Sequence, residues 1–266
     1  MTRHLVAFAS LVLLASCAAP GAAPSESLRA EMAPKGALRA AVNFGNPSIA
    51  QKDAAGGDPR GVGPDLAREL ARRLGVPIRY VAYETAGKVA DDAQKDVWDV
   101  AFLAIDPQRA ATISFSPAYV EIGGTYLVRA DSPLHRIEEF DRKGIRVAVA
   151  LRSGYDLYLS RTLKNVELVR TANSQLAIDR FLTGGLDAAA GVRELLTRNA
   201  KSHPGLRVID ENFMVIRQAA AVPKGHDAAA AFLGEFIEDA KASGFVADAV
   251  KRSGSTDATL APAAKK

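Results

Sequence analysis

Strand-like and helix-like runs alternate along most of the chain, and this alternation limits the possible folds more than any other feature. The first series contains strands at 37–42, 78–83 and 100–105 and helices at 64–74 and 87–96. In the first of these helices, Leu66, Leu70 and Leu74 recur at helical spacing. Pro64 suits its first turn, and Gly75 can end it. This order predicts a mainly parallel sheet covered by helices.

A second series of the same kind occupies the later half of the chain. It contains strands at 144–149, 166–169 and 187–191 and helices at 155–163, 174–182 and 192–200. Two of its segments echo the first series, because 145–149 (IRVAV) matches 38–42 (LRAAV) and 186–190 (LDAAA) resembles 98–102 (WDVAF). The repeated order predicts two similar α/β lobes.

Two segments can connect these lobes. The apolar run 125–129 leaves the first lobe, and 212–222 can return to it, which would make a double hinge. Helical residues at 227–243 and 245–253 then close the first lobe. We predict lobe 1 at 36–125, lobe 2 at 126–211, a return to lobe 1 at 212–253 and a disordered tail at 254–266.

The N-terminal residues are typical of a signal peptide. A basic start is followed by an apolar run at 5–14, too short to cross a bilayer as a helix. The run ends in 14–17 (LASC), which resembles the lipobox of bacterial lipoproteins, and Cys17 is the only cysteine in the chain. We expect a signal peptide at 1–17 with lipidation at Cys17, then a flexible tether at 18–35. The alternative is an ordinary secretory signal that is cut at a nearby small residue.

Charge and motifs argue against several classes of function. The formal net charge is +4, without a basic run, so a nucleic-acid-binding surface is not indicated. The four histidines are not spaced for metal ligation, and no P-loop or G-x-S-x-G motif occurs. The segment 61–63 (GVG) begins like a dinucleotide-binding fingerprint, but Leu66 replaces the third glycine. We expect no cofactor, no metal site and no enzymatic activity, although carboxylates that meet in a cleft would permit acid–base chemistry.

One arginine follows the end of an apolar strand. The run 100–105 turns at Asp106 and Pro107, and Arg109 comes directly afterwards. A guanidinium stays charged and presents a rigid fork of N–H donors that matches a carboxylate. Arg109 is therefore a candidate for binding a ligand carboxylate. The alternative is a structural ion pair with a nearby acid such as Asp106.

Five segments stand out by their order and spacing: 36–39 (GALR), 61–76 (GVGPDLARELARRLGV), 98–101 (WDVA), Arg109 and 113–119 (ISFSPAY). Together they resemble the bacterial extracellular solute-binding proteins of family 3, the amino-acid-type receptors of ABC importers. The resemblance covers nearly all of residues 36–253. It implies two α/β lobes joined by a two-strand hinge, as in type II periplasmic binding proteins, with the ligand cleft between the lobes.

The resemblance also implies which residues contact the solute. In this family, the arginine at the position of Arg109 binds the ligand carboxylate through two hydrogen bonds. The loop after the first strand supplies an aromatic side chain that forms one wall of the site, and a turn in lobe 2 supplies hydrogen-bond donors. The ligand-binding residues would then be Arg109, Phe44, Asn46, Leu103, Ala104, Ser153, Gly154, Tyr155, Asp156 and Arg193. Simpler roles stay open, because Ser153 can cap a helix, Phe44 can belong to the core and Asn46 can start a turn.

One position departs from the pattern of the family. Amino-acid binders carry an acidic residue that holds the ligand ammonium, and Val192 stands at that position here. Either another carboxylate replaces it, such as Glu121, Asp156 or Glu194, or the ligand has no α-ammonium. In the second case Arg193 would favour an anionic solute.

We therefore expect a lipid-anchored, extracytoplasmic receptor, monomeric and without a cofactor. It would capture a small carboxylated metabolite, an amino acid or a related organic acid, and deliver it to an ABC transporter permease. One alternative is an enzyme on the same scaffold, similar to cyclohexadienyl dehydratase. The other is a sensory or accessory lipoprotein whose partner is a different protein.

Overall fold

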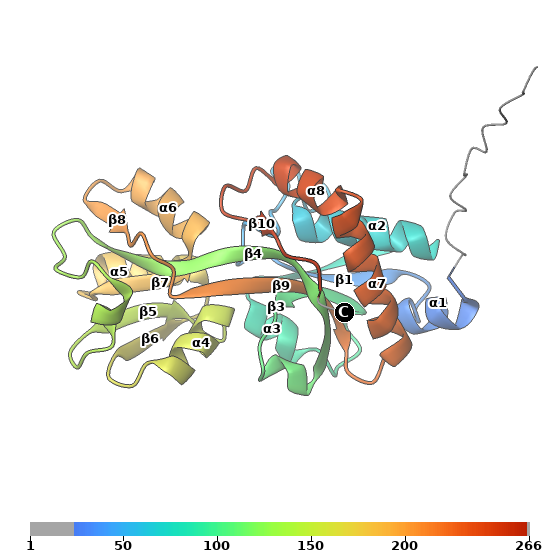
Figure 1. Ribbon diagram of the computed structural model, residues 1–266, viewed down its shortest axis with the longest axis horizontal. Helices are drawn as coiled ribbons and strands as arrows, with labels where there is room; N and C mark the ends of the chain where they lie inside the picture. Colours follow the sequence, from blue (N-terminus) through green and yellow to red (C-terminus); the bar gives the residue numbers. More distant parts are fainter. Residues whose placement is uncertain (1–23, 265–266) are drawn as a thin grey trace, which may run out of the picture.

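The structure is a computed structural model that describes residues 24–264. Its strands form one mixed sheet in the order β2-β1-β3-β9-β4-β7-β5-β6, and β8 and β10 also pair with β4. Helices gather around each end of this sheet and form two lobes (Figure 1). The predicted fold class, two α/β lobes joined by a two-strand hinge, is confirmed.

The first lobe is built around three parallel strands. Strand β1 (Leu38–Asn43) lies between β2 (Ile78–Tyr83) and β3 (Val100–Ala104). Helices α2 (Val62–Leu74) and α3 (Ala86–Asp91) make the two crossovers, as the alternating pattern predicts. Parallel strands need such crossovers because the end of one strand and the start of the next lie at opposite edges of the sheet.

The second lobe repeats this arrangement. Strand β5 (Arg146–Ala150) lies between β6 (Glu167–Thr171) and β7 (Ala188–Val192), and both pairs are parallel. Its helices are α4 (Gly154–Thr162), α5 (Ser174–Thr183) and α6 (Arg193–Ser202). A 3-10 helix at Ile137–Phe140 and the short strand β8 (Leu206–Val208) complete this lobe.

Two long antiparallel strands run through both lobes. They are β4 (Ile113–Arg129) and β9 (Met214–Pro223), which pair along most of their length (Figure 1). On β4, the side chain of Val120 lies in the core of the first lobe and that of Ile122 in the core of the second. The chain therefore passes between lobes at Val120–Ile122, a few residues before the boundary at 125/126 that we expected.

After β9 the chain returns to the first lobe. Helices α7 (Asp227–Ala242) and α8 (Phe245–Ser253) pack there together with α2, and the apolar faces of these three helices share one core. Leu66 and Leu70 of α2 are fully buried in it. The helical periodicity in the sequence therefore marks the packed faces correctly.

The prediction of a flexible tether at 18–35 is wrong for the described part of that segment. Residues Glu26–Met32 form helix α1, and the hydroxyl of Ser25 caps it by accepting the N–H of Leu28. Met32 is only 1% exposed and belongs to the core of the first lobe. A composition rich in small residues does not reveal one long apolar side chain that anchors the segment. Cys17, its lipidation and the signal peptide at 1–17 lie outside the described residues.

We predict that Met32→Ala lowers the free energy of unfolding by about 2–5 kcal/mol, as for other buried methionines that are truncated to alanine. A flexible tether would give no change. Chemical denaturation of the full-length chain measures this difference. Glu26→Ala is the matched control because its side chain is exposed on the same helix. Equal stability of the two variants would contradict the docking of α1.

The prediction of a disordered tail at 254–266 is also wrong for its described part. Strand β10 (Thr259–Leu260) pairs with β4, and Ala261 is buried. The buried ammonium of Lys241 donates to the carbonyl of Pro262 at 2.7 Å, which holds the segment against α7. A two-residue strand has too little sequence pattern to be predicted.

Among the described residues, no helix combines the length and the apolar character that crossing a bilayer would require.

Candidate functional site

A cavity lies between the lobes, where the carboxyl ends of all six parallel strands meet. It is lined by Asn43 at the end of β1 and by Gly45 and Asn46 after it, by residues at or just after the ends of β2, β3, β5 and β6, by Val192 at the end of β7, by Arg109, and by Ile216 and Gln218 of β9. Ligand sites in α/β proteins form at this edge of the sheet. The cavity has a volume of about 40 Å³, room for only about three water molecules at roughly 10–15 Å³ each.

Arg109 is the one cationic side chain among the described residues that line this cavity. It starts the 3-10 helix Arg109–Ala111 and is 3% exposed. Its terminal nitrogens donate to the carbonyl of Ala104 and, across the cleft, to that of Arg152, both at 3.0 Å. Its Nε is buried without a partner. Burial lowers the pKa of Arg109 to about 10, so the group stays charged at neutral pH.

Asp106 does not form the structural ion pair with Arg109 that we considered. Its buried carboxylate pairs with Arg161 of α4 at 2.8 Å and accepts the backbone N–H of Gln108. The pair with Arg161 crosses from one lobe to the other. The guanidinium of Arg109 therefore has no carboxylate partner among the described residues.

The second lobe places a helix N-terminus against the cavity. Ser153 caps α4 by accepting the N–H of Asp156 at 3.0 Å. The hydroxyl of Tyr155 shares a hydrogen bond with Ser174, which also donates to the carbonyl of Gly45 across the cleft. A Cβ on Gly154 would lie 3.0 Å from that of Ala104, so a glycine lets the two lobes approach closely here.

Seven of the ten residues predicted from the sequence line the cavity: Arg109, Asn46, Leu103, Ala104, Ser153, Gly154 and Tyr155. They come from the loops and strand ends that the family resemblance indicated. Contact with a solute remains a proposal for each of them.

The other three predicted residues, Phe44, Asp156 and Arg193, are not among the residues that line the cavity. The ring of Phe44 lies 5.3 Å from the ammonium of Lys52 and packs with it outside the cavity. The carboxylate of Asp156 is occupied by Arg170 at 3.1 Å and by the backbone N–H of Arg152 at 2.7 Å. Arg193 donates to the carbonyls of Asp210 and Glu211 and to the side chain of Asn212.

Several lining residues were missed in the sequence. The polar ones are Asn43, Glu84, Thr85, Asn173, Ser174 and Gln218. Thr85 and Asn173 are the N-caps of α3 and α5, so they follow β2 and β6 as Ser153 follows β5. Applying one rule, a capping residue directly after each parallel strand, would have found both of them.

Val192 lies at the cavity, as the family pattern indicated, and is 5% exposed. It occupies the N-cap position of α6 and has no capping side chain. The nearest acid along this helix is Glu194, which points away from the cavity and into contacts between the lobes.

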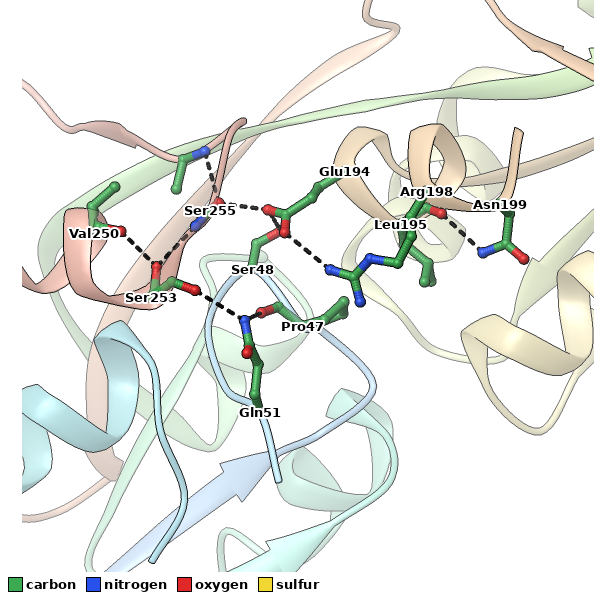
Figure 2. A network of polar contacts seen from close by, with 11 residues as sticks. Pro47, Ser48, Gln51, Glu194, Leu195, Arg198, Asn199, Val250, Ser253 and Ser255 are labelled. Carbon is green, nitrogen blue, oxygen red and sulfur yellow. Dashed lines mark hydrogen bonds and ion pairs between the residues drawn. The ribbon is translucent and has the colours of Figure 1, made fainter. Parts of the chain in front are cut away.

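The carboxylate of Glu194 joins the two lobes (Figure 2). Its Oε2 accepts the hydroxyls of Ser48 at 2.8 Å and of Ser255 at 2.5 Å, while Arg198 donates to Oε1 at 3.2 Å. Glu194 is 8% exposed, and Ser48 is fully buried. On the other side of the cleft, Arg152 pairs with Asp91 of the first lobe. The lobes are thus in direct polar contact on both sides of the cavity.

Comparisons with known proteins agree with this geometry. The profile of the bacterial extracellular solute-binding proteins, family 3, matches residues 38–254. A glutamine-binding protein from Geobacillus stearothermophilus is 23% identical over an alignment of 231 residues, and the match covers 80% of this chain and 87% of that protein. A mutant of ArgBP from T. maritima has a TM-score of 0.74 at 23% identity and covers 85% of this chain and 99% of its own.

A further solved structure bears on the question of catalysis. It is an ancestral amino acid-binding protein described as a precursor of cyclohexadienyl dehydratase, with a TM-score of 0.72 at 23% identity. It covers 84% of this chain and 98% of its own. At this level of identity the two structural matches establish the shared fold.

Proposed function

The chain belongs to the bacterial extracellular solute-binding proteins of family 3, and from this premise we propose that it captures a small carboxylated metabolite between its lobes and delivers it to an ABC transporter permease. The proposal depends most on Arg109, a buried guanidinium at the cavity whose Nε has no partner. A buried cation without a carboxylate is costly, and its low pKa has the same cause. A ligand carboxylate would offset this cost.

In this proposal, the ligand gains its binding energy from contacts that form when the two lobes close around it. The ligand would contact Arg109 from the first lobe and the cavity-facing start of α4 from the second. Bending of β4 and β9 between the lobes would bring the two sides together. Because such a ligand contacts both lobes only when they are closed, it shifts the population toward the closed form. A permease can then distinguish the loaded receptor by its shape.

The lining residues favour binding over catalysis. A dehydratase needs positioned groups that transfer protons. The lining residues in the described part of the chain include no lysine or histidine, and Glu84, the acid among them, has a 65% exposed side chain that pairs with Lys52. We expect no product when the purified chain is incubated with prephenate or arogenate. Formation of product would favour the enzyme instead.

We also propose that Cys17 carries a lipid that holds the receptor at a membrane surface outside the cytoplasm. The extracellular family supports this location, and the LASC segment supports the modification. We expect Cys17→Ser to release the protein into the soluble fraction. Purification of the chain with an ABC permease, rather than with a sensor protein, would support delivery to a transporter.

We predict that carboxylic acids stabilise the full-length chain against heat and that their primary amides do not. A ligand at a hundred times its dissociation constant adds about 2.7 kcal/mol of stability. Glycolate with glycolamide and L-lactate with lactamide are suitable pairs, because each amide keeps the shape of its acid and removes the negative charge. Equal melting temperatures with acid and amide would contradict a role for the charge of Arg109.

A further inference from the structure

We propose that this receptor selects carboxylates that carry a neutral polar group, such as a hydroxyl, in place of an α-ammonium, and that Asn46 and Val192 determine this choice. The inference rests on the proposed function, since it takes Arg109 as the partner of the ligand carboxylate. It specifies the chemistry of the opposite end of the ligand.

The carboxylates around the cavity are already occupied. Asp106 pairs with Arg161, and Asp156 pairs with Arg170. The carboxylate of Glu194 receives three donors within the contact between the lobes (Figure 2). Among the described residues that line the cavity, this leaves the exposed Glu84, whose partner is Lys52. A buried ammonium would therefore find no free carboxylate.

The neutral acceptor oxygens at the cavity are also largely committed. The side-chain oxygens of Asn43, Thr85, Ser153 and Asn173 each accept a backbone N–H close by in the chain. These bonds fix the loops and helix starts that shape the cavity. An ammonium needs several acceptors at once, because it has three N–H donors. The lining leaves too few of them for such a group.

The side chains of Gln218 and Asn46 are the exceptions, since neither makes a hydrogen bond within the described residues. Asn46 is 8% exposed and lines the cavity, and its Oδ1 is buried without a partner. Its backbone makes the turn after β1, so the side chain is not needed for the turn. Leaving a buried polar atom unpaired costs about 1–3 kcal/mol. A ligand group that forms a hydrogen bond with this amide would remove that cost. A ligand hydroxyl can satisfy Oδ1 by donating its proton to it.

Charge balance leads to the same ligand class. Arg109 and a ligand carboxylate together are neutral, whereas an added ammonium would leave a net positive charge inside the closed cavity. Val192 lines the cavity with a hydrocarbon side chain, which cannot accept a hydrogen bond. Burying an uncompensated charge is far more costly than burying a neutral group that makes its hydrogen bond. The site thus penalises amino acids relative to their hydroxy analogues.

Matched pairs of ligands test this inference. Full-length protein is titrated with glycolate and glycine, L-lactate and L-alanine, L-malate and L-aspartate, and L-phenyllactate and L-phenylalanine. In at least one pair, we expect the hydroxy acid to bind and to do so at least about tenfold more tightly than the amino acid. Tighter binding of the amino acid, or no binding by any hydroxy acid, overturns the inference. Tight amino-acid binding that depends on Arg109 would still leave the proposed function intact.

Three variants, two of Val192 and one of Asn46, separate the charge from the shape of the site. Val192→Asp returns a carboxylate to the cavity, and we expect the preference within the pair to reverse toward the amino acid. Aspartate is also a favourable N-cap, so α6 should persist. Val192→Asn is the neutral control of nearly the same shape and should not reverse the preference. Asn46→Asp should shift it in the same direction as Val192→Asp. Unchanged selectivity in both aspartate variants overturns the inference.

Discussion

Replacing Arg109 by alanine is expected to weaken the binding of carboxylate ligands at least about 30-fold while the chain stays folded. The ligand carboxylate would then be buried in the closed cavity without a partner, which costs about 2–5 kcal/mol, or roughly 30- to 5,000-fold in affinity. The fold should survive because burial of this cation is itself unfavourable, as its lowered pKa of about 10 indicates. Titration calorimetry measures the affinity, and thermal unfolding without ligand measures the stability.

Arg109→Lys is the matched control for this experiment. It keeps a positive charge but replaces the planar fork by a single ammonium, so it cannot bind a carboxylate through two parallel hydrogen bonds. We expect affinity between that of the native chain and that of Arg109→Ala. If Arg109→Ala binds ligands as tightly as the native chain, the guanidinium only holds Ala104 and Arg152 together, and its part in binding is refuted.

Local periodicity explains why most of the fold could be predicted. The leucines of α2 and the short echoes between 38–42 and 145–149 are patterns within a few residues, and they mark packed faces that any α/β lobe requires. Helix α1 and strand β10 were missed for the opposite reason. Each is held by one or two side chains that contact distant elements, as Met32 does, and a short segment carries no such signal.

The same distinction applies to the site. Ser153 and Arg109 follow strand ends, and since the carboxyl ends of parallel strands meet at one edge of the sheet, their place at the cavity could be predicted. Asp156 and Arg193 also stand next to strand ends. Their side chains are taken by partners that only the tertiary structure brings near, Arg170 and Asn212. The position of a residue after a strand predicts that it lies near the cavity. It does not predict whether another part of the protein will bind its side chain and keep it from a ligand.

Glu194→Ala is expected to shift the ligand-free protein from closed toward open lobes. In the closed form its carboxylate accepts Ser48 and Ser255, which lie far from it in the sequence (Figure 2). Hydrogen bonds to a charged group contribute about 1.5–3 kcal/mol each, so losing them should lower the ratio of closed to open molecules at least about tenfold. Small-angle X-ray scattering of the ligand-free chain should show a larger radius of gyration.

Glu167→Ala is the control for this shift, because its exposed carboxylate lies on β6 of the same lobe and pairs with Arg146 of the neighbouring strand β5. It should leave the radius of gyration unchanged. A ligand that binds the closed form should return Glu194→Ala to the native radius, but at a higher concentration, since apparent affinity falls with the fraction of closed molecules. An unchanged radius without ligand would show that Glu194 does not hold the lobes together, and the ion pairs of Arg152 and Arg161 would then account for the closed arrangement.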